Sequence, residues 1–219
     1  MANAPDAAVG RFVSALSVLL TRIQVDDGQR DASNPFVWLW HKLQAAALSS
    51  VARQSSLYFA RLDPTFHIRL RSILEQQLEL EEARGVSLPD FVTPTANAYR
   101  YVFGLLGKVV PQGSKTDFVA NVGTRIGAAT VIADCVSDWK EDLAAGRANP
   151  ATDDASARRA ISFVRCELEA ASQLMMRELG PDSRGVAIIN RVLETVGDEI
   201  TCMRCAAQPL LGVQASPFN

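Results

Sequence analysis

The 219-residue chain has few of the residues on which several protein classes depend. Its four cysteines are too few for a disulfide framework, and glycine and proline together make up only about a tenth of the chain, which excludes collagen-like and low-complexity architectures. Lysine and arginine number 22 against 24 aspartate and glutamate residues, so no excess of positive charge is available for a nucleic-acid backbone. We therefore expect a globular protein without a nucleic-acid partner.

The N-terminal part of the chain lacks the pattern of a signal peptide or of a membrane span. No basic region precedes the apolar run 12–20, and Arg11 and Arg22 bracket that run closely. We expect a cytoplasmic protein without a transmembrane segment, in which the cysteines stay thiols. Cys202 and Cys205 form a C-x-x-C pair, but no second cysteine pair and no spaced histidine pair completes a zinc site.

Apolar residues recur at helical spacing along nearly the whole chain, and alternation of period two is almost absent. Asn34-Pro35 and Asp63-Pro64 are typical helix-start signals. The pattern predicts seven or eight helices and an all-α, single-domain helical bundle covering residues 1–219. The helices are expected at 5–25, 35–52, 64–84, 89–110, 114–145, 152–179 and 184–207.

Three aspartates follow one another at intervals of four residues in the sequence IADCVSDWKED. Asp134, Asp138 and Asp142 share one face of a helix with 3.6 residues per turn. Like charges at this spacing destabilise a helix by a few tenths of a kcal/mol unless a cation lies between them. Carboxylates are ligands that Mg²⁺ prefers, so this ladder is a candidate metal site.

A second acidic set, Asp26, Asp27 and Asp31, lies at the end of the first predicted helix. The two sets could face each other across a bundle, and the alternative is that both are solvated helix faces. Gly123 and Gly127 precede the first ladder on nearly the same helix face, where mid-helix glycines cost about 0.5–1 kcal/mol each relative to alanine. Such glycines favour a close approach, either of another helix or of a ligand.

These motifs resemble those of the trans-isoprenyl synthase-like proteins, which include squalene and phytoene synthases and class I terpene synthases. Asp134, Asp138 and Asp142 match the spacing of that family's second metal motif, and Gly146-Arg147 and Pro150 follow it as they do in squalene and phytoene synthases. Asp26 and Asp27 with Asp31 resemble the first motif. The stretch 99–104, YRYVFG, resembles a helix of phytoene synthases that carries tyrosine and glycine.

The resemblance implies a fold of the isoprenoid-synthase type and an activity on an allylic isoprenoid diphosphate. The protein would be a Mg²⁺-dependent terpene synthase or prenyl transferase in which both aspartate sets bind the metal. Arg147 would hold the diphosphate, and Tyr101 is an aromatic candidate for stabilising a carbocation. The oligomeric state is not readable from one sequence, and a homodimer is one option.

Two other interpretations stay open. The ladder of Asp134, Asp138 and Asp142 followed by Gly-x-x-Asn-Pro, here Gly146 to Pro150, also resembles an uncharacterised family of bacterial helical proteins, which implies the fold but no settled activity. The competing functional class is a non-enzymatic helical binding or regulatory protein whose aspartates are surface or capping residues. Thermal stability in the presence of Mg²⁺ and pyrophosphate separates the enzyme from the binding protein, because it should rise for the enzyme and stay unchanged for the binding protein.

Overall fold

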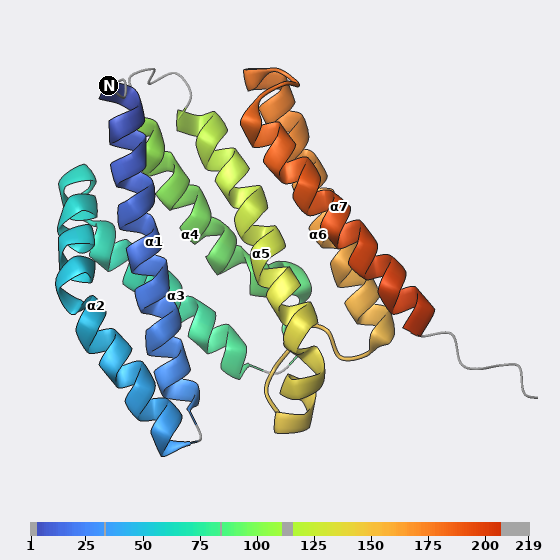
Figure 1. Ribbon diagram of the computed structural model, residues 1–219. Helices are drawn as coiled ribbons and strands as arrows, with labels where there is room; N and C mark the ends of the chain where they lie inside the picture. The colour runs from blue at the N-terminus through green and yellow to red at the C-terminus, as the bar shows by residue number, and fades with distance from the viewer. Residues whose placement is uncertain (1–3, 33, 84, 111–115, 207–219) are drawn as a thin grey trace, which may run out of the picture. The chain divides into compact units, whose positions relative to one another are not determined.

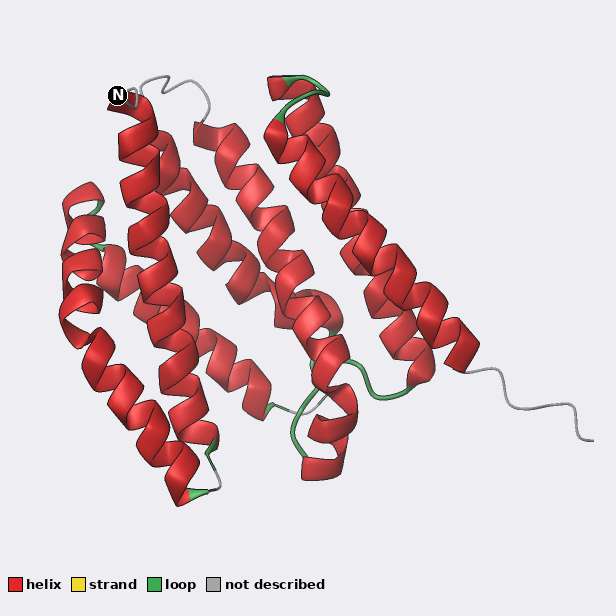
Figure 2. Cartoon of the chain, in the orientation of Figure 1, coloured by secondary structure: helices red, strands yellow, loops and turns green. Residues whose placement is uncertain are grey.

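A computed structural model describes residues 4–32, 34–83, 85–110 and 116–206, and the side chains of 4–6, 27, 30, 31 and 196–206 are outside this description. The described residues form seven α-helices and no strand (Figures 1 and 2), which confirms the predicted all-α class. The isoprenoid-synthase type of bundle stays a prediction. The helices are α1 (Ala4–Asp31), α2 (Pro35–Leu62), α3 (Phe66–Glu82), α4 (Leu88–Val109), α5 (Thr116–Ala145), α6 (Asp154–Leu179) and α7 (Arg184–Ala206).

The helices belong to two compact units. Unit 1 comprises Met1–Gln76 and Asn97–Gly123, and unit 2 comprises Gln77–Ala96 and Thr124–Asn219. Helices α3, α4 and α5 therefore each contribute one part to each unit. The single domain expected from the pattern stays a prediction.

In unit 1, α1 and α2 pack against each other. The start of α2 is defined by local chemistry, because the Asn34 side chain accepts a hydrogen bond from the backbone N–H of Phe36 at 2.8 Å and Pro35 occupies the first turn. The helix ends at Leu62, since Asp63 takes an extended conformation and Pro64 follows. Nothing between residues 52 and 62 interrupts the helix, which explains why α2 is ten residues longer than predicted.

Aromatic rings form the core of unit 1. Phe12 of α1, Phe59 of α2 and Phe66 of α3 are almost completely buried, together with Val102 and Leu105 of α4. The Phe59 ring lies 5.2 Å from the Phe12 ring in an edge-to-face arrangement and stacks on Phe66 at 4.8 Å between centroids. Such pairs contribute about 0.5–1.5 kcal/mol beyond the burial of their surface.

Two glycines of unit 1 allow close helix contacts. A Cβ atom at Gly28 of α1 would lie 2.7 Å from the ring of His41 on α2. Helix α1 continues past this glycine to Asp31, beyond the predicted end at residue 25. A Cβ atom at Gly123 of α5 would lie 2.6 Å from the side chain of Phe103 on α4. Of the two explanations for a mid-helix glycine at position 123, close packing against a helix is the one realised.

Unit 2 has an aliphatic core. Small and branched side chains of α4, α5, α6 and α7 meet there, among them Ala129, Ile132, Ala160, Ala171 and Ile189. Helices α6 and α7 pack against each other, and the Ser172 hydroxyl donates a hydrogen bond to the Asn190 side chain at 2.9 Å. An ion pair between Arg125 of α5 and Glu167 of α6, at 2.9 Å, joins α6 to α5 as well.

Two described stretches are long and apolar enough to cross a membrane by length and composition, Ala7–Asp26 in α1 and Thr116–Ala145, which is α5. Half of the apolar window of α5 is buried, as in a core helix of a soluble protein, whereas only 11% of the window in α1 is buried. The expected absence of a transmembrane segment and the cytoplasmic location stay predictions.

Candidate functional site

The predicted ladder lies on the last turns of α5, within unit 2. Asp134 and Asp138 are exposed, Asp142 is half-buried, and neither Asp134 nor Asp138 has a hydrogen bond or an ion pair among the described residues. Partial loss of hydration, followed by the negative charges of Asp138 and Asp142, raises the pKa of Asp134. Asp134 and Asp138 therefore have no compensating ion pair among the described residues, and a cation would relieve their repulsion.

The end of α5 explains the Gly-Arg pair in local terms. Gly146 has a φ of 70°, a conformation that favours glycine, and its N–H donates to the carbonyl of Leu143. The N–H of Arg147 donates to the carbonyl of Asp142 at 2.9 Å. These two bonds form a Schellman motif, which terminates helices that end in glycine.

The turn at the end of α5 places the Arg147 side chain against Asp142, the last aspartate of the ladder. The Arg147 Nε donates to Asp142 Oδ1 at 2.7 Å, in an ion pair whose arginine is largely exposed and whose aspartate side chain is 16% exposed. The positive charge of Arg147 thus lies beside Asp142, and its role in holding a diphosphate stays a prediction. The same ion pair compensates the charge of Asp142, which distinguishes it from Asp134 and Asp138.

Asn149 joins the loop after α5 to two points on that helix. Its Nδ2 donates to Asp142 Oδ2 at 2.8 Å and to the carbonyl of Cys135 at 2.9 Å, while its Oδ1 accepts from the N–H of Ala151 at 2.8 Å. Asn149 was not among the predicted site residues. The Gly-x-x-Asn-Pro pattern pointed to Asn149 as a residue of interest. Its contact with residue 135 could not be predicted, because that contact depends on the path of the loop.

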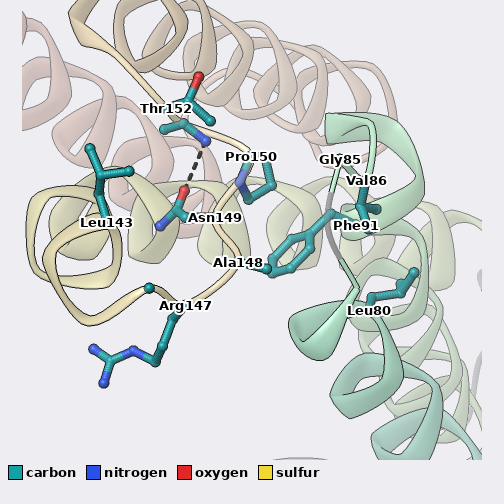
Figure 3. Close-up of a pocket in the computed structure, with 12 residues that line it drawn as sticks. Leu80, Gly85, Val86, Phe91, Leu143, Arg147, Ala148, Asn149, Pro150 and Thr152 are labelled. Carbon is teal, nitrogen blue, oxygen red and sulfur yellow. Dashed lines mark hydrogen bonds between the residues drawn. The ribbon is translucent and has the colours of Figure 1, made fainter.

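A pocket of about 290 Å³ lies between the loop that follows α5 and the chain around the start of α4. Figure 3 shows the ring of Phe91 pointing toward Ala148 and Pro150, while the side chain of Arg147 points away from Phe91 and Leu80. The lining is mostly apolar, and Asp134 and Asp138 are not part of it. This pocket is suited to a small apolar group beside the Arg147–Asp142 pair.

Cys135 lies next to the first aspartate but on the buried side of α5. Burial, followed by the charges of Asp134 and Asp142, raises the pKa of the Cys135 thiol to about 12. The thiol therefore stays protonated at neutral pH and is not a nucleophile. Cys202 and Cys205 have side chains outside the described residues.

The acidic set at the end of α1, Asp26 with Asp27 and Asp31, is only partly described. Asp26 belongs to unit 1, where its Oδ2 accepts a hydrogen bond from Arg22 Nε at 2.9 Å one helical turn away. Another donor of Arg22 bonds the carbonyl of Ala45, so this arginine also ties α1 to α2. The side chains of Asp27 and Asp31 lie outside the described residues, and their predicted role as metal ligands stays a prediction.

Tyr101 also belongs to unit 1. Its hydroxyl donates a hydrogen bond to Asp63 Oδ2 at 2.9 Å, and the guanidinium of Arg69 lies 5.4 Å from the ring centroid. Burial and the hydrogen bond to Asp63 raise the pKa of Tyr101 to about 12, and bonds from Thr65 and Tyr101 lower the pKa of Asp63 to about 2. In this position Tyr101 links α4 to the turn between α2 and α3.

Comparison of the chain with protein families, curated proteins and solved structures finds no match. Within the described side chains, no group of three or more His, Cys, Asp or Glu residues is arranged to hold a metal ion. The structure joins Arg147 to Asp142, and Asp134 and Asp138 lie on the same face of α5. The resemblance to isoprenyl synthases continues to rest on the motifs alone.

Proposed function

We propose that the protein is a Mg²⁺-dependent enzyme that binds an allylic isoprenoid diphosphate and ionises it, as terpene synthases and prenyl transferases do. The observation that carries the proposal is the pair Asp134 and Asp138. These carboxylates are exposed, lie one helical turn apart and have no partner among the described residues, and the pKa of Asp134 is raised. An arginine, Arg147, pairs with Asp142, the next aspartate of the same ladder.

The chemistry of this donor set fits magnesium. Mg²⁺ in proteins is commonly bound by one or two carboxylates, with the remaining positions taken by water and by phosphate oxygens of the substrate. Asp134 and Asp138 would hold the ion, which when bound supplies positive charge that neutralises a diphosphate. Arg147 would bind a diphosphate oxygen, and the half-buried Asp142 keeps the guanidinium in place.

The first test is a thermal unfolding experiment on the full chain. If Mg²⁺ and pyrophosphate together bind at about 100 times their dissociation constant, they stabilise the protein by about 2.7 kcal/mol, which raises the melting temperature by about 5–10 °C. Asp134→Asn and Asp138→Asn should each abolish this rise, whereas Asp182→Asn, at an exposed turn of the same unit, should retain it. Release of pyrophosphate from geranyl or farnesyl diphosphate then tests turnover.

The second candidate function is a non-enzymatic helical binding or regulatory protein. It is favoured by the ion pairs of Asp142 with Arg147 and of Asp26 with Arg22, which give two of the predicted ligands a structural role. This function predicts no response of the melting temperature to Mg²⁺ with pyrophosphate in the wild type. A flat response, together with no release of pyrophosphate, would reject the enzyme and leave this candidate.

A further inference from the structure

Helix α2 is apolar on two opposite faces. Ala45, Ala52, Ser55 and Phe59 are buried on its inner face. The outer face carries Phe36, Trp40 and Leu43, which are 81%, 61% and 57% exposed, and Leu39 extends the same face. At 100° per residue these four side chains fall within about 100° of the helix circumference, so they form one continuous stripe.

The first turns of α2 extend this exposed apolar surface around the helix. Val37 and Trp38 are also exposed, on other sides of the helix axis. Farther along, Val51 and Leu57 are 46% and 52% exposed and continue the apolar character of the outer face. We call the residues 36–43 the α2 apolar segment. Soluble monomers rarely expose so many large apolar side chains together, and such patches mark interaction sites.

The charges on α2 are of one sign. The helix contains Lys42, Arg53 and Arg61 and no aspartate or glutamate, and all three cations are exposed. The ammonium of Lys42 lies 4.6 Å from the centroid of the Trp38 ring, which places a cation beside an aromatic ring within the α2 apolar segment. Unit 1 has eleven lysine and arginine residues against seven aspartate and glutamate residues.

The exposed aromatic side chains and the basic residues of α2 together favour one binding partner. Tryptophan and phenylalanine at a helix end, with a lysine beside them and further basic residues along the same helix, are side chains that enter the boundary between lipid headgroups and acyl chains. A symmetric pairing of two α2 helices would contain no ion pair between them, since neither helix has an acidic residue. We propose that the α2 apolar segment docks on a lipid bilayer surface that carries anionic headgroups.

Two forces would hold the protein on such a surface. Phe36, Trp40 and Leu43 would bury apolar area at the headgroup boundary, and Lys42, Arg53 and Arg61 would be attracted by the negative surface potential. The association is peripheral, because the stripe occupies only the outer face of a helix whose inner face packs in the core of unit 1. The proposal is independent of the enzymatic activity proposed for unit 2.

The test is co-sedimentation of the full chain with vesicles of phosphatidylcholine that contain about a quarter phosphatidylglycerol. The wild type should bind these vesicles, and Phe36→Ser combined with Trp40→Ser should weaken the apparent affinity at least about tenfold. The matched control is Ile188→Ser, a 65% exposed apolar residue on α7, which should bind like the wild type. Circular dichroism checks that each variant folds, and the exposed positions make this the expected result.

Charge is tested separately. Changing Lys42, Arg53 or Arg61 to glutamine should weaken binding to the anionic vesicles about fivefold for each cation and leave binding to pure phosphatidylcholine unchanged. The chain has three tryptophans, so Trp139→Phe leaves Trp38 and Trp40 as the reporters. Brominated lipid should quench their fluorescence if the α2 apolar segment enters the bilayer surface.

Three results would overturn the proposal. The first is a wild-type protein that sediments with neither vesicle, and the second is an Ile188→Ser variant that loses binding as fully as the double variant. The third is a wild type that elutes as a dimer and a Phe36→Ser, Trp40→Ser variant that elutes as a monomer, with no vesicle binding by either. That last result would assign the α2 apolar segment to a second copy of the chain.

Discussion

Unit 1 packs around the rings of Phe12, Phe59 and Phe66, whereas unit 2 packs around small and branched aliphatic side chains such as Ala171 and Ile132. The charges differ as well, because unit 1 has four more basic than acidic residues, while unit 2 has eleven basic and seventeen acidic ones. The near-neutral net charge of the chain conceals this asymmetry. A negative site and a surface suited to anionic lipid are thus found in different units.

The largest expected effect concerns the aromatic core of unit 1. Phe59→Ala should destabilise the protein by about 3–5 kcal/mol, since the ring is completely buried and contacts the rings of Phe12 and Phe66. Ile132→Val, which removes one methylene group from the equally buried core of unit 2, should cost about 0.5–1.5 kcal/mol. Urea denaturation measures both, and a cost of Phe59→Ala below about 3 kcal/mol would contradict the close packing of the three rings.

The second prediction uses two helical glycines of unit 1. Gly123→Ala should cost about 1–3 kcal/mol, because the added Cβ would lie 2.6 Å from Phe103 and the helices would have to separate. Gly10→Ala is the matched control, as no atom lies within 4 Å of the added Cβ, and it should stabilise by about 0.5–1 kcal/mol. A neutral Gly123→Ala would show that α4 and α5 separate easily at this point.

The third prediction concerns the loop that follows α5 in unit 2. Asn149→Ala leaves one oxygen of Asp142 without its donor and removes a second donor from the carbonyl of Cys135, which should cost about 1–3 kcal/mol in urea denaturation. Asn97→Ala serves as a control, since Asn97 is exposed on α4. An Asn149→Ala variant as stable as the control would mean that the Schellman turn at Gly146 holds the loop without Asn149.

The smallest expected effect tests the acidic character of unit 2. Asp134→Asn removes one repelling carboxylate and should stabilise the metal-free protein at neutral pH by a few tenths of a kcal/mol. A raised pKa in the native state means that native Asp134 binds more protons than unfolded Asp134 between about pH 4 and its native pKa, so its contribution to stability falls as pH rises there.

The matching measurement is the unfolding free energy of Asp134→Asn and wild type as a function of pH. The advantage of the variant should vanish below about pH 4, where Asp134 is protonated in both states. Asp182→Asn, at an exposed turn, should track the wild type at every pH. If Asp134→Asn is less stable than the wild type at neutral pH, the carboxylate has a favourable partner and the repulsion argument is wrong.

Several features followed from local pattern alone. The 3.6-residue period predicted an all-α protein, and the spacing of Asp134, Asp138 and Asp142 placed them on one helix face. The starts of α2 and α3 agreed with the Asn34-Pro35 and Asp63-Pro64 signals within about two residues. Each of these inferences uses interactions between residues at most eight positions apart, which the helix geometry determines by itself.

Other features depended on which segments meet in space. Asn149 reaches the carbonyl of Cys135, 14 residues away, only because a left-handed Gly146 turns the chain back along α5. The close contact of Gly123 with Phe103 and the exposure of Phe36 and Trp40 on an apolar helix likewise follow from the choice of neighbouring helices. A helical period says which residues share a face, but not what covers it, since that depends on free energies summed over contacts between distant parts of the chain.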